Sequence, residues 1–405
     1  MNSGDTAWIL VATALVFFMT LPGLAMFYAG LVRSNSVLSV VMHCVAVAAL
    51  ASLLWLFVGY SLAFDDSVGG MIGGVGKAFF SGITTDRLSG SIPEIVFAIF
   101  QMTFVIITPA LIVGAYVERI KFSGVVILSS AWVLLVYAPI AHWVWGGGWL
   151  GDLGVMDFAG GIVVHTSAGV AALVTAAFLG RRSGFPDQLQ PPHNPGLTAM
   201  GAGMLWVGWF GFNGGSQLAA DGGAGMAIAV THIAAASAAL VWSAIEWIKF
   251  GKPSLVGAVT GVIAGLATVT PTSGFVGPVG GLILGAAAGA VCFFAVDVVK
   301  KKLKIDDSLD VFAVHGVGGI LGTLLVAVLA IHALDGGGVL VESGTVGSQL
   351  GVQAIGVVAA VAWSAGFTFL ILKVTAVLTG GLRVDEEAEL VGLDLTAHGE
   401  RGYDL

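Results

Sequence analysis

Long, uninterrupted apolar runs are the feature that most restricts how this chain can fold. Segments such as 36–62 and 94–117 exceed the roughly 18 mainly apolar residues that mark a bilayer span. Hydrophobic residues make up 57% of the 405 residues and charged residues only 10%, whereas a soluble domain has about 45–50% and about 25%. The sequence therefore excludes a soluble protein. It also excludes a β-barrel, whose strands would give alternating segments of about ten residues.

Charged or turn-rich breaks divide the apolar sequence into eleven predicted transmembrane helices, since one tilted helix needs about 20 residues. These spans are 7–31, 36–62, 94–117, 123–143, 158–179, 196–215, 224–248, 254–271, 277–299, 308–331 and 348–378. Residues 63–93 form the one long connection and are expected outside the membrane. The sequence thus predicts an all-α integral membrane protein with a transmembrane domain over 1–379 and a tail over 380–405.

The basic residues predict how the chain is oriented. Fourteen of the sixteen Lys and Arg residues lie on one side of the predicted bundle, and only Lys77 and Arg87 lie on the other. The side rich in Lys and Arg is the cytoplasmic one. Because the number of spans is odd, the N-terminus is expected outside and the tail inside a cell inner (cytoplasmic) membrane.

Residue usage excludes several classes of function. The net charge is −8, and no basic patch could neutralise the phosphates of a nucleic acid. Cys44 and Cys292 lie inside apolar runs, so we expect them to act as small hydrophobic residues, with no disulfide or metal site. The sequence contains no apparent nucleophile–base set or metal cluster. We therefore expect neither an enzyme nor a resident cofactor.

Two segments with the same pattern suggest that the chain contains two related halves. Asp157 precedes His165 by eight residues in DFAGGIVVHTSAG, and Asp307 and Asp310 precede His315 in DSLDVFAVHGVGG. The two segments enter the membrane from opposite sides in the predicted topology. This is the arrangement expected of an inverted repeat of spans 1–5 and 6–10, whose functional site lies between the repeats.

The two histidines of these segments are the first candidates for a functional site. Each is expected near the middle of the membrane, where an ionisable side chain is costly unless it faces protein or a water-filled path. A packing role is the alternative for any single histidine, and we keep it for His43 and His232. Axial ligation of a haem is a further alternative for His165 and His315, but the glycine-rich surroundings offer little apolar surface for a porphyrin. The matched contexts favour a functional pair.

Three predicted spans carry aromatic and polar residues near their outer ends. These residues lie in segments 100–104, 143–145 and 209–216. Aromatic ring faces attract a desolvated cation by about 0.5–2 kcal/mol, and a hydroxyl such as that of Ser216 accepts hydrogen bonds from an ammonium-type donor. The alternative is the aromatic belt at membrane interfaces. An interfacial aromatic belt does not account well for the glycine-rich segment Trp209–Ser216.

Long motifs throughout the chain resemble the ammonium transporter family (Amt/Mep/Rh), and in particular its bacterial or archaeal Amt type. They are LPGLAMFYAGLVRSNSV, DFAGGIVVH, GWFGFNGGS, DVFAVHGVGGILG and GLRVDEEAELVGLDLTAHGERGY. The resemblance extends from the first span to the tail. It implies uptake of ammonium by eleven helices, with one pore in each subunit of a homotrimer embedded in membrane lipid.

The resemblance also implies the residues of an outer substrate site and a gate. Trp145, Phe104 and Ser216 match a site that recruits ammonium from the outside. Phe104 and Phe212 match two stacked rings that close the pore.

The remaining implied site residues lie deeper. His165 and His315 match twin histidines that share a hydrogen bond within the pore. Asp157, Trp209 and Thr270 match supporting positions near the pathway. For Asp157 two roles remain open, which are the capping of its helix and direct handling of a proton.

These observations and the resemblance lead to three hypotheses about function. In the first, ammonium is deprotonated and ammonia crosses an apolar pore. The others are an ammonium sensor that signals through its tail and a passive ammonia gas channel. By resemblance, the tail couples subunits and, with the inner loops, receives a PII-type signalling protein.

Overall fold

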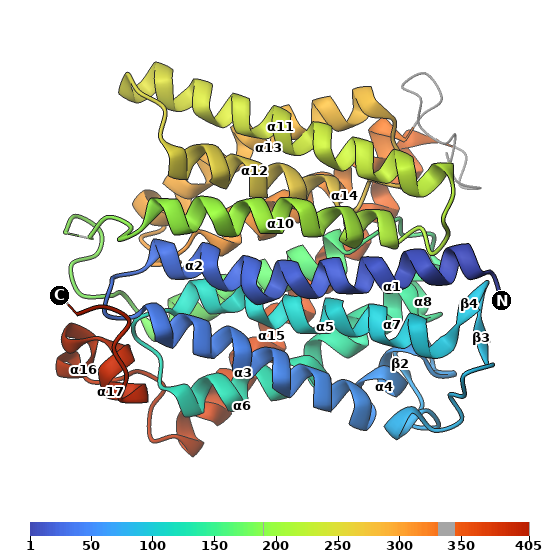
Figure 1. Ribbon diagram of the computed structural model, residues 1–405, viewed down its shortest axis with the longest axis horizontal. Coiled ribbons are helices and arrows are strands. Elements are labelled where there is room, and N and C mark those ends of the chain that lie inside the picture. Colours follow the sequence, from blue (N-terminus) through green and yellow to red (C-terminus); the bar gives the residue numbers. More distant parts are fainter. Residues whose placement is uncertain (189, 331–344, 405) are drawn as a thin grey trace.

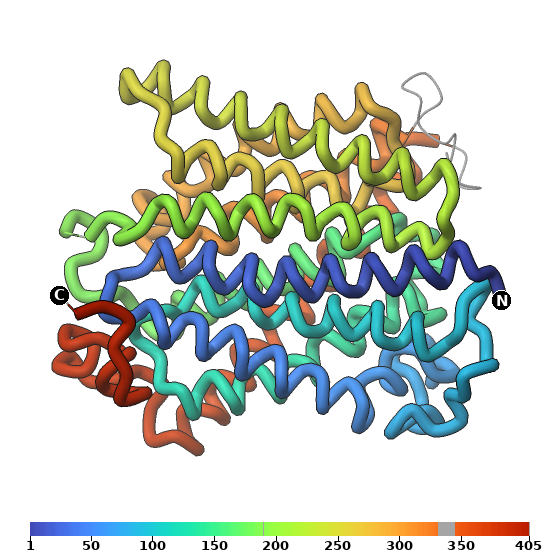
Figure 2. The backbone as a smooth tube through the Cα atoms, viewed as in Figure 1, coloured from blue at the N-terminus to red at the C-terminus, as the bar shows by residue number. Residues whose placement is uncertain are grey.

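The computed structural model describes residues 1–188, 190–330 and 345–404 and contains a bundle of helices that run along its longest axis (Figure 1). The N-terminus and the C-terminal tail lie at opposite ends of this bundle. The connection that follows residue 180 lies at the same end as the tail (Figure 2). All of the larger elements are helical, as the apolar runs predict.

The elements, in chain order, have the following bounds. The α-helices are α1 (Ser3–Phe18), α2 (Ala25–Leu31), α3 (Val37–Leu54), α4 (Tyr60–Phe64), α5 (Glu94–Tyr116), α6 (Phe122–Trp132), α7 (Ala138–Trp145), α8 (Trp149–Asp152), α9 (Ser167–Leu179), α10 (Pro195–Gly215), α11 (Gly222–Phe250), α12 (Leu255–Val269), α13 (Pro278–Asp297), α14 (Val317–Leu329), α15 (Val346–Leu378), α16 (Glu386–Val391) and α17 (Leu393–His398). Wider π-helical turns are η1 (Met19–Leu24), η2 (Trp55–Gly59), η4 (Val133–Tyr137), η5 (Gly161–Thr166), η6 (Val298–Lys302) and η7 (Phe312–Gly316), and η3 (Ala78–Phe80) is a 3₁₀ turn. The strands are β1 (Ser67–Val68), β2 (Ile72–Gly73), β3 (Leu88–Ser89) and β4 (Ile92–Pro93).

Each of the eleven predicted spans contains helix. Among the described residues, nine helical stretches, the fourth of which is interrupted at residues 146–148, are long and apolar enough to cross a membrane. The other two predicted spans correspond to α10, which has 21 residues, and α12, which has 15. The fourth stretch continues to Asp152, beyond the predicted boundary at residue 143. Residues 331–344, which include the end of the tenth predicted span, lie outside the described residues.

The predicted extramembrane segment 63–93 is built from two short antiparallel hairpins, β1–β2 and β3–β4. Glu94, at the start of α5, anchors this segment through an ion pair with Lys77 at 2.8 Å and a second ion pair with Arg87. Lys77 and Arg87 are the two basic residues that the charge analysis assigns to the outer side. Both therefore have a carboxylate partner at this end of the bundle.

Glycine allows the two histidine-bearing segments to approach each other closely. Gly169 follows His165 by four residues, and a side chain there would overlap the backbone of Gly316. Gly319 follows His315 by four residues, and a Cβ atom there would lie 2.8 Å from the Cβ of His165. Only a residue without a side chain permits such contacts, which is how membrane helices pack in the absence of a hydrophobic driving force.

Candidate functional site

A pocket of about 320 Å³ opens at the end of the bundle that the sequence predicts to be the outer one. Trp145 from α7, Phe104 from α5 and Ser216, directly after α10, all line it. The structure therefore brings together the three residues that the sequence assigns to an outer substrate site. The other lining residues are Phe64, Phe97, Gln101, Val144, Phe158 and Leu218.

The polar hydrogens of two of these side chains already have acceptors in the protein. The Ser216 hydroxyl donates to the carbonyl oxygen of Phe212 at 2.8 Å. The Trp145 indole donates through Nε1 to the carbonyl oxygen of Asp157 at 2.8 Å. Ser216 is therefore left with oxygen lone pairs and Trp145 with its ring face, and both attract a donor-rich cation.

Phe104, which lines this pocket, packs against the ring of Phe212. The ring centroids of Phe104 and Phe212 are 4.3 Å apart, and the ring planes differ by 31°. Both side chains are buried, with exposed fractions of 1% and 0%. Phe212 in turn lies 6.1 Å from the His165 ring. The pair thus separates the outer pocket from the histidines.

His165 in η5 and His315 in η7 face each other beyond the phenylalanine pair. Their Nδ1 atoms are 3.2 Å apart, and their nearly parallel rings have centroids 5.3 Å apart. A hydrogen bond between two Nδ1 atoms requires one ring to donate and the other to accept, so two neutral rings must adopt different tautomers. Both side chains are buried.

Trp209 and Thr270 form a contact that supports His165. The Trp209 ring stacks on the His165 ring with centroids 5.4 Å apart. Trp209 Nε1 donates to Thr270 Oγ1 at 2.9 Å, and that hydroxyl donates to the carbonyl oxygen of Leu266. These bonds fix the plane of the indole, and with it the surface against which the imidazole lies.

Asp157 lies at the start of the His165 segment and accepts four backbone hydrogen bonds. Its Oδ1 accepts from Gly160 and Gly161 at 2.8 and 2.5 Å, and its Oδ2 accepts from Ile162 and Val163 at 2.8 and 3.1 Å. The first backbone N–H groups of a helix have no partner within the helix. Of the two roles left open by the sequence, this geometry favours helix capping.

Asp307 occupies the corresponding position before His315. Its Oδ2 accepts a hydrogen bond from the backbone N–H of Phe312, the first residue of η7, at 2.7 Å. Each histidine thus follows by eight residues an aspartate that bonds to the start of its segment.

A second cavity, of about 200 Å³, lies beside His315 on the side that the sequence predicts to be the inner one. His315 lines it, together with Arg182, Lys300 and Asp310. Lys300 and Asp310 form an ion pair at 2.7 Å. The charged lining contrasts with the aromatic lining of the first pocket.

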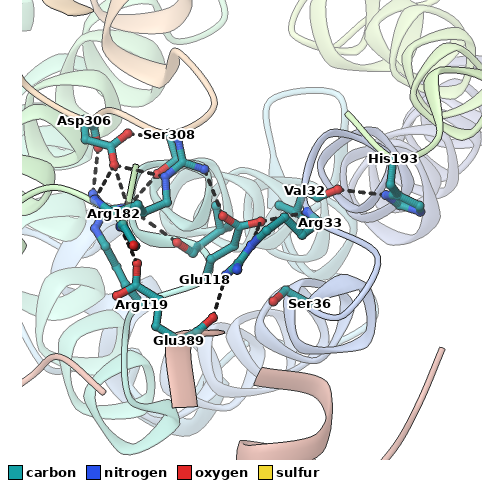
Figure 3. Close-up of polar contacts among 12 residues, drawn as sticks. Val32, Arg33, Ser36, Glu118, Arg119, Arg182, His193, Asp306, Ser308 and Glu389 are labelled. Carbon is teal, nitrogen blue, oxygen red and sulfur yellow. Dashed lines mark hydrogen bonds and ion pairs between the residues drawn. The ribbon is translucent and has the colours of Figure 1, made fainter. Parts of the chain in front are cut away.

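Arg182 also belongs to a buried ionic cluster at the inner end of the bundle (Figure 3). It pairs with Asp306 at 2.9 Å and with Glu118 at 3.0 Å, and Arg33 pairs with Glu118 at 3.3 Å. Burial alone would raise the pKa of Glu118, but Arg182 and Arg33 outweigh it and hold the pKa below its usual value. The cluster therefore remains ionised at neutral pH.

The tail binds to this cluster and to the loops beside it. Glu389 accepts a hydrogen bond from the backbone N–H of Ser183 at 2.8 Å, and its backbone carbonyl accepts from Arg33. Asp394 accepts from the backbone N–H of Ser39 at 2.7 Å. Contacts from α16 and α17 thus reach both the α2–α3 connection and the segment after α9.

Sequence reasoning assigned no role to Gln101 or to the inner cluster. Gln101 is the one amide side chain in α5, and an isolated polar residue in an apolar span is a signal that could have identified it. His43 packs against Phe122, and His232 stacks on Trp206. Those two histidines thus have the aromatic neighbours expected of packing residues.

Comparison with known proteins identifies the relatives of this chain. The profile of the Ammonium Transporter Family matches residues 7–403. A putative ammonium transporter of Methanothermobacter thermautotrophicus is 46% identical over 414 residues, covering 100% of this chain and 99% of the relative. Ammonium transporter Amt1 of Archaeoglobus fulgidus is 45% identical over 404 residues, with 100% of both chains covered.

Solved structures agree with this match. A protein named Sensor Amt Protein superposes with a TM-score of 0.91 at 32% identity, covering 98% of each chain. Saccharomyces cerevisiae Mep2 superposes with a TM-score of 0.86 at 35% identity, covering 96% of this chain and 88% of that one.

Proposed function

Because the chain belongs to the ammonium transporter family, we propose that it takes up ammonium by binding the cation outside, removing a proton, and passing ammonia along the two histidines. The observation that best supports this mechanism is the order in which the parts of the site follow one another along the bundle. The outer pocket, the Phe104–Phe212 pair, the His165–His315 pair and the inner cavity follow one another along the bundle.

Ammonium binds first in the outer pocket. The ring faces of Phe104 and Trp145 attract its charge, and Ser216 accepts one of its N–H groups, because the hydroxyl proton of Ser216 already has an acceptor. Potassium has a similar size and the same charge. Binding in this pocket alone therefore gives little discrimination between the two ions.

Discrimination arises where the path becomes apolar. The buried rings of Phe104 and Phe212 offer no compensating charge, so a cation loses hydration there without replacement. Ammonium can transfer a proton to the His165–His315 pair and continue as neutral ammonia, whereas potassium has no proton to transfer. Nε2 of His165 has no hydrogen-bond partner within the described part of the chain, which leaves it available to ammonia.

The same proposal includes the topology of the chain. Eleven spans cross the cytoplasmic membrane with the N-terminus outside, residues 1–379 form the transmembrane domain, and residues 380–405 form an inner tail. The opposite positions of the two termini (Figure 1) support an odd number of crossings, and the distribution of basic residues supports an outer N-terminus. The parallel roles of Asp157 and Asp307 support an inverted repeat of spans 1–5 and 6–10.

Assembly and partners complete the proposal. The chain forms a homotrimer in membrane lipid, and its inner face binds a PII-type signalling protein. The docking of Glu389 and Asp394 on the inner loops supports a tail that responds to events at this face. No step requires a metal or other cofactor. The relatives are named as transporters, which agrees with a protein that is not an enzyme.

Currents across a membrane that contains the purified protein test this function. We expect a current, or an accompanying pH change, on addition of ammonium and none on addition of an equal concentration of potassium. Equal responses to the two ions would contradict the mechanism.

A sensor is the second candidate, because the Sensor Amt Protein is 32% identical over 98% of this chain. A sensor would bind ammonium without sustained flux, so the same measurement separates the two functions. A passive gas channel is disfavoured by the outer pocket, because uncharged ammonia gains little from the ring faces of Trp145 and Phe104.

Two substitutions in the outer pocket test the binding step. Ser216→Ala and Trp145→Leu each remove about 1 kcal/mol of cation binding outside the barrier. We therefore expect the concentration for half-maximal uptake to rise about fivefold, with maximal uptake unchanged. Uptake measured against ammonium concentration gives both quantities. Unchanged half-saturation in both variants would refute the outer site.

The role of the tail is tested by its removal from Gly381. We expect lower flux but an intact trimer, because the spans form the bundle and the tail only binds to their inner ends. Glu389→Gln should reduce flux severalfold, because it removes the charge that pairs with Arg383 and that accepts the hydrogen bond from the Ser183 backbone. Glu387→Gln, an exposed acid of the same helix, is the matched control. Loss of the trimer on truncation, or full flux in Glu389→Gln, would argue against this role.

A further inference from the structure

Gln101 lies on the face of α5 that forms one wall of the outer pocket. Phe97, Gln101 and Phe104 are spaced by four and three residues, which places them on one side of a helix, and all three line the pocket. The amide of Gln101 thus lies between two aromatic residues of the same wall.

The carbonyl oxygen of this amide is not satisfied by the protein. Oε1 of Gln101 is buried and has no hydrogen-bond partner among residues 1–188, 190–330 and 345–404. The side chain as a whole is 8% exposed. Buried polar atoms are nearly always hydrogen-bonded in native proteins. The buried Oε1 faces the pocket only after the amide group rotates by half a turn, which exchanges the positions of Oε1 and Nε2. This rotation breaks no hydrogen bond between Gln101 and the described residues, so a partner that enters the pocket can bind the oxygen.

The other polar groups of the pocket indicate the chemistry of that partner. Ser216 and Trp145 both direct their hydrogens to backbone carbonyls, of Phe212 and Asp157 respectively. The ligand therefore meets the oxygen of Ser216, the aromatic ring faces and, once the amide has rotated, the oxygen of Gln101. Ammonium has four N–H donors and no lone pair, so several acceptors around one small volume match it.

On the basis of the proposed function, we propose that Gln101 is an additional substrate-binding residue. Its Oε1 accepts an N–H of ammonium in the outer pocket, alongside the Ser216 hydroxyl and the rings of Phe104 and Trp145. A carbonyl oxygen also attracts potassium, so Gln101 determines how tightly the cation is captured. Exclusion of potassium remains with the apolar path beyond the pocket.

Two variants of Gln101 and one neighbour test this assignment in liposomes. Gln101→Leu removes the acceptor, and we expect half-saturation by ammonium to rise about tenfold or more at unchanged maximal flux, as befits a hydrogen bond to a charged group. Gln101→Glu retains an acceptor of the same size, and we expect half-saturation to be equal to that of the wild type or lower. Thr103→Val is the matched control, because its hydroxyl donates within its own helix to Phe100.

The outcomes separate this assignment from the proposed function. Wild-type half-saturation in Gln101→Leu, with a raised value in Ser216→Ala, would remove Gln101 from the site and leave the pocket assigned. Wild-type values in both would refute the pocket itself. A tenfold rise in Thr103→Val, or a fall in maximal flux without a change in half-saturation in Gln101→Leu, would indicate a packing role and overturn the assignment. If Gln101→Leu does not assemble, Gln101→Glu tests the assignment in its place. A concentration for half-saturation in Gln101→Glu that is well above the wild-type value would contradict a substrate-binding role for Gln101.

Discussion

His165→Asp is expected to let potassium pass and His315→Leu to abolish the ammonium-driven current. An aspartate at position 165 places a negative charge in a path that otherwise lacks one. At 4 Å and an effective dielectric constant of about 20, such a charge attracts a cation by about 4 kcal/mol, which corresponds to a loss of selectivity of a hundredfold or more. Leucine at position 315 removes the partner of the 3.2 Å contact between the two imidazoles, so proton handling by the pair ends.

Potassium and ammonium currents should be recorded in the same liposomes for the wild type and both variants. His232→Leu is the matched control, because it makes the same change at an intramembrane histidine that stacks on Trp206 outside the histidine pair. We expect it to retain wild-type currents. If His165→Asp still excludes potassium, or if His315→Leu carries the full ammonium current, the twin-histidine mechanism is wrong and the pair serves only to pack helices.

Asp157→Ala is expected to cost several kcal/mol of stability and to eliminate transport. The alanine leaves the backbone N–H groups of 160–163 without their acceptor, and each buried donor left unpaired costs about 1–3 kcal/mol. The segment that carries His165 begins at these residues. Asp157→Asn retains one oxygen for two of the four donors and turns its amide hydrogens toward the other two, so an intermediate loss is expected.

Thermal unfolding and flux, measured on the same preparations, test this prediction. Asparagine cannot exchange a proton, so flux that survives in Asp157→Asn in proportion to its remaining stability supports capping. Wild-type stability combined with no ammonium current would instead establish a direct proton role. Asp152→Asn, at an exposed acid on the same end of the bundle, controls for loss of outer negative charge.

The helices could be predicted from the sequence because apolar runs are a signal within each segment. Their finer geometry could not. The stretch from α6 to Asp152 extends beyond its predicted boundary, because Trp145 and Trp149 are compatible with either helix or an interfacial loop. The π-helical turns at His165 and His315 have no periodic signature in the sequence, so the apolar runs do not predict them.

Some features of the candidate site could likewise be predicted from the sequence, and others could not. His165 and His315 could be paired in advance because each follows an acid at a matching position in a matching context. The Trp209–Thr270 bond and the cluster around Glu118 and Arg182 join residues far apart in sequence. The distribution of charges along the sequence assigns Glu118 and Arg182 to one side of the membrane. It does not predict which acidic and basic side chains form ion pairs.

The glycine contacts at the histidine crossing have a consequence for how the path can open. Gly169 and Gly319 bring main chain directly against the opposite segment, so the separation of the imidazoles is determined by backbone contact and not by the rotamers of long side chains. Close-packed interiors resist small continuous deformations. The crossing of the two histidine segments is therefore a fixed-width element, and in the proposed mechanism any motion that admits substrate takes place where movable side chains line the path. The rings of Phe104 and Phe212 and the charged inner mouth around Lys300 and Asp310 are those places.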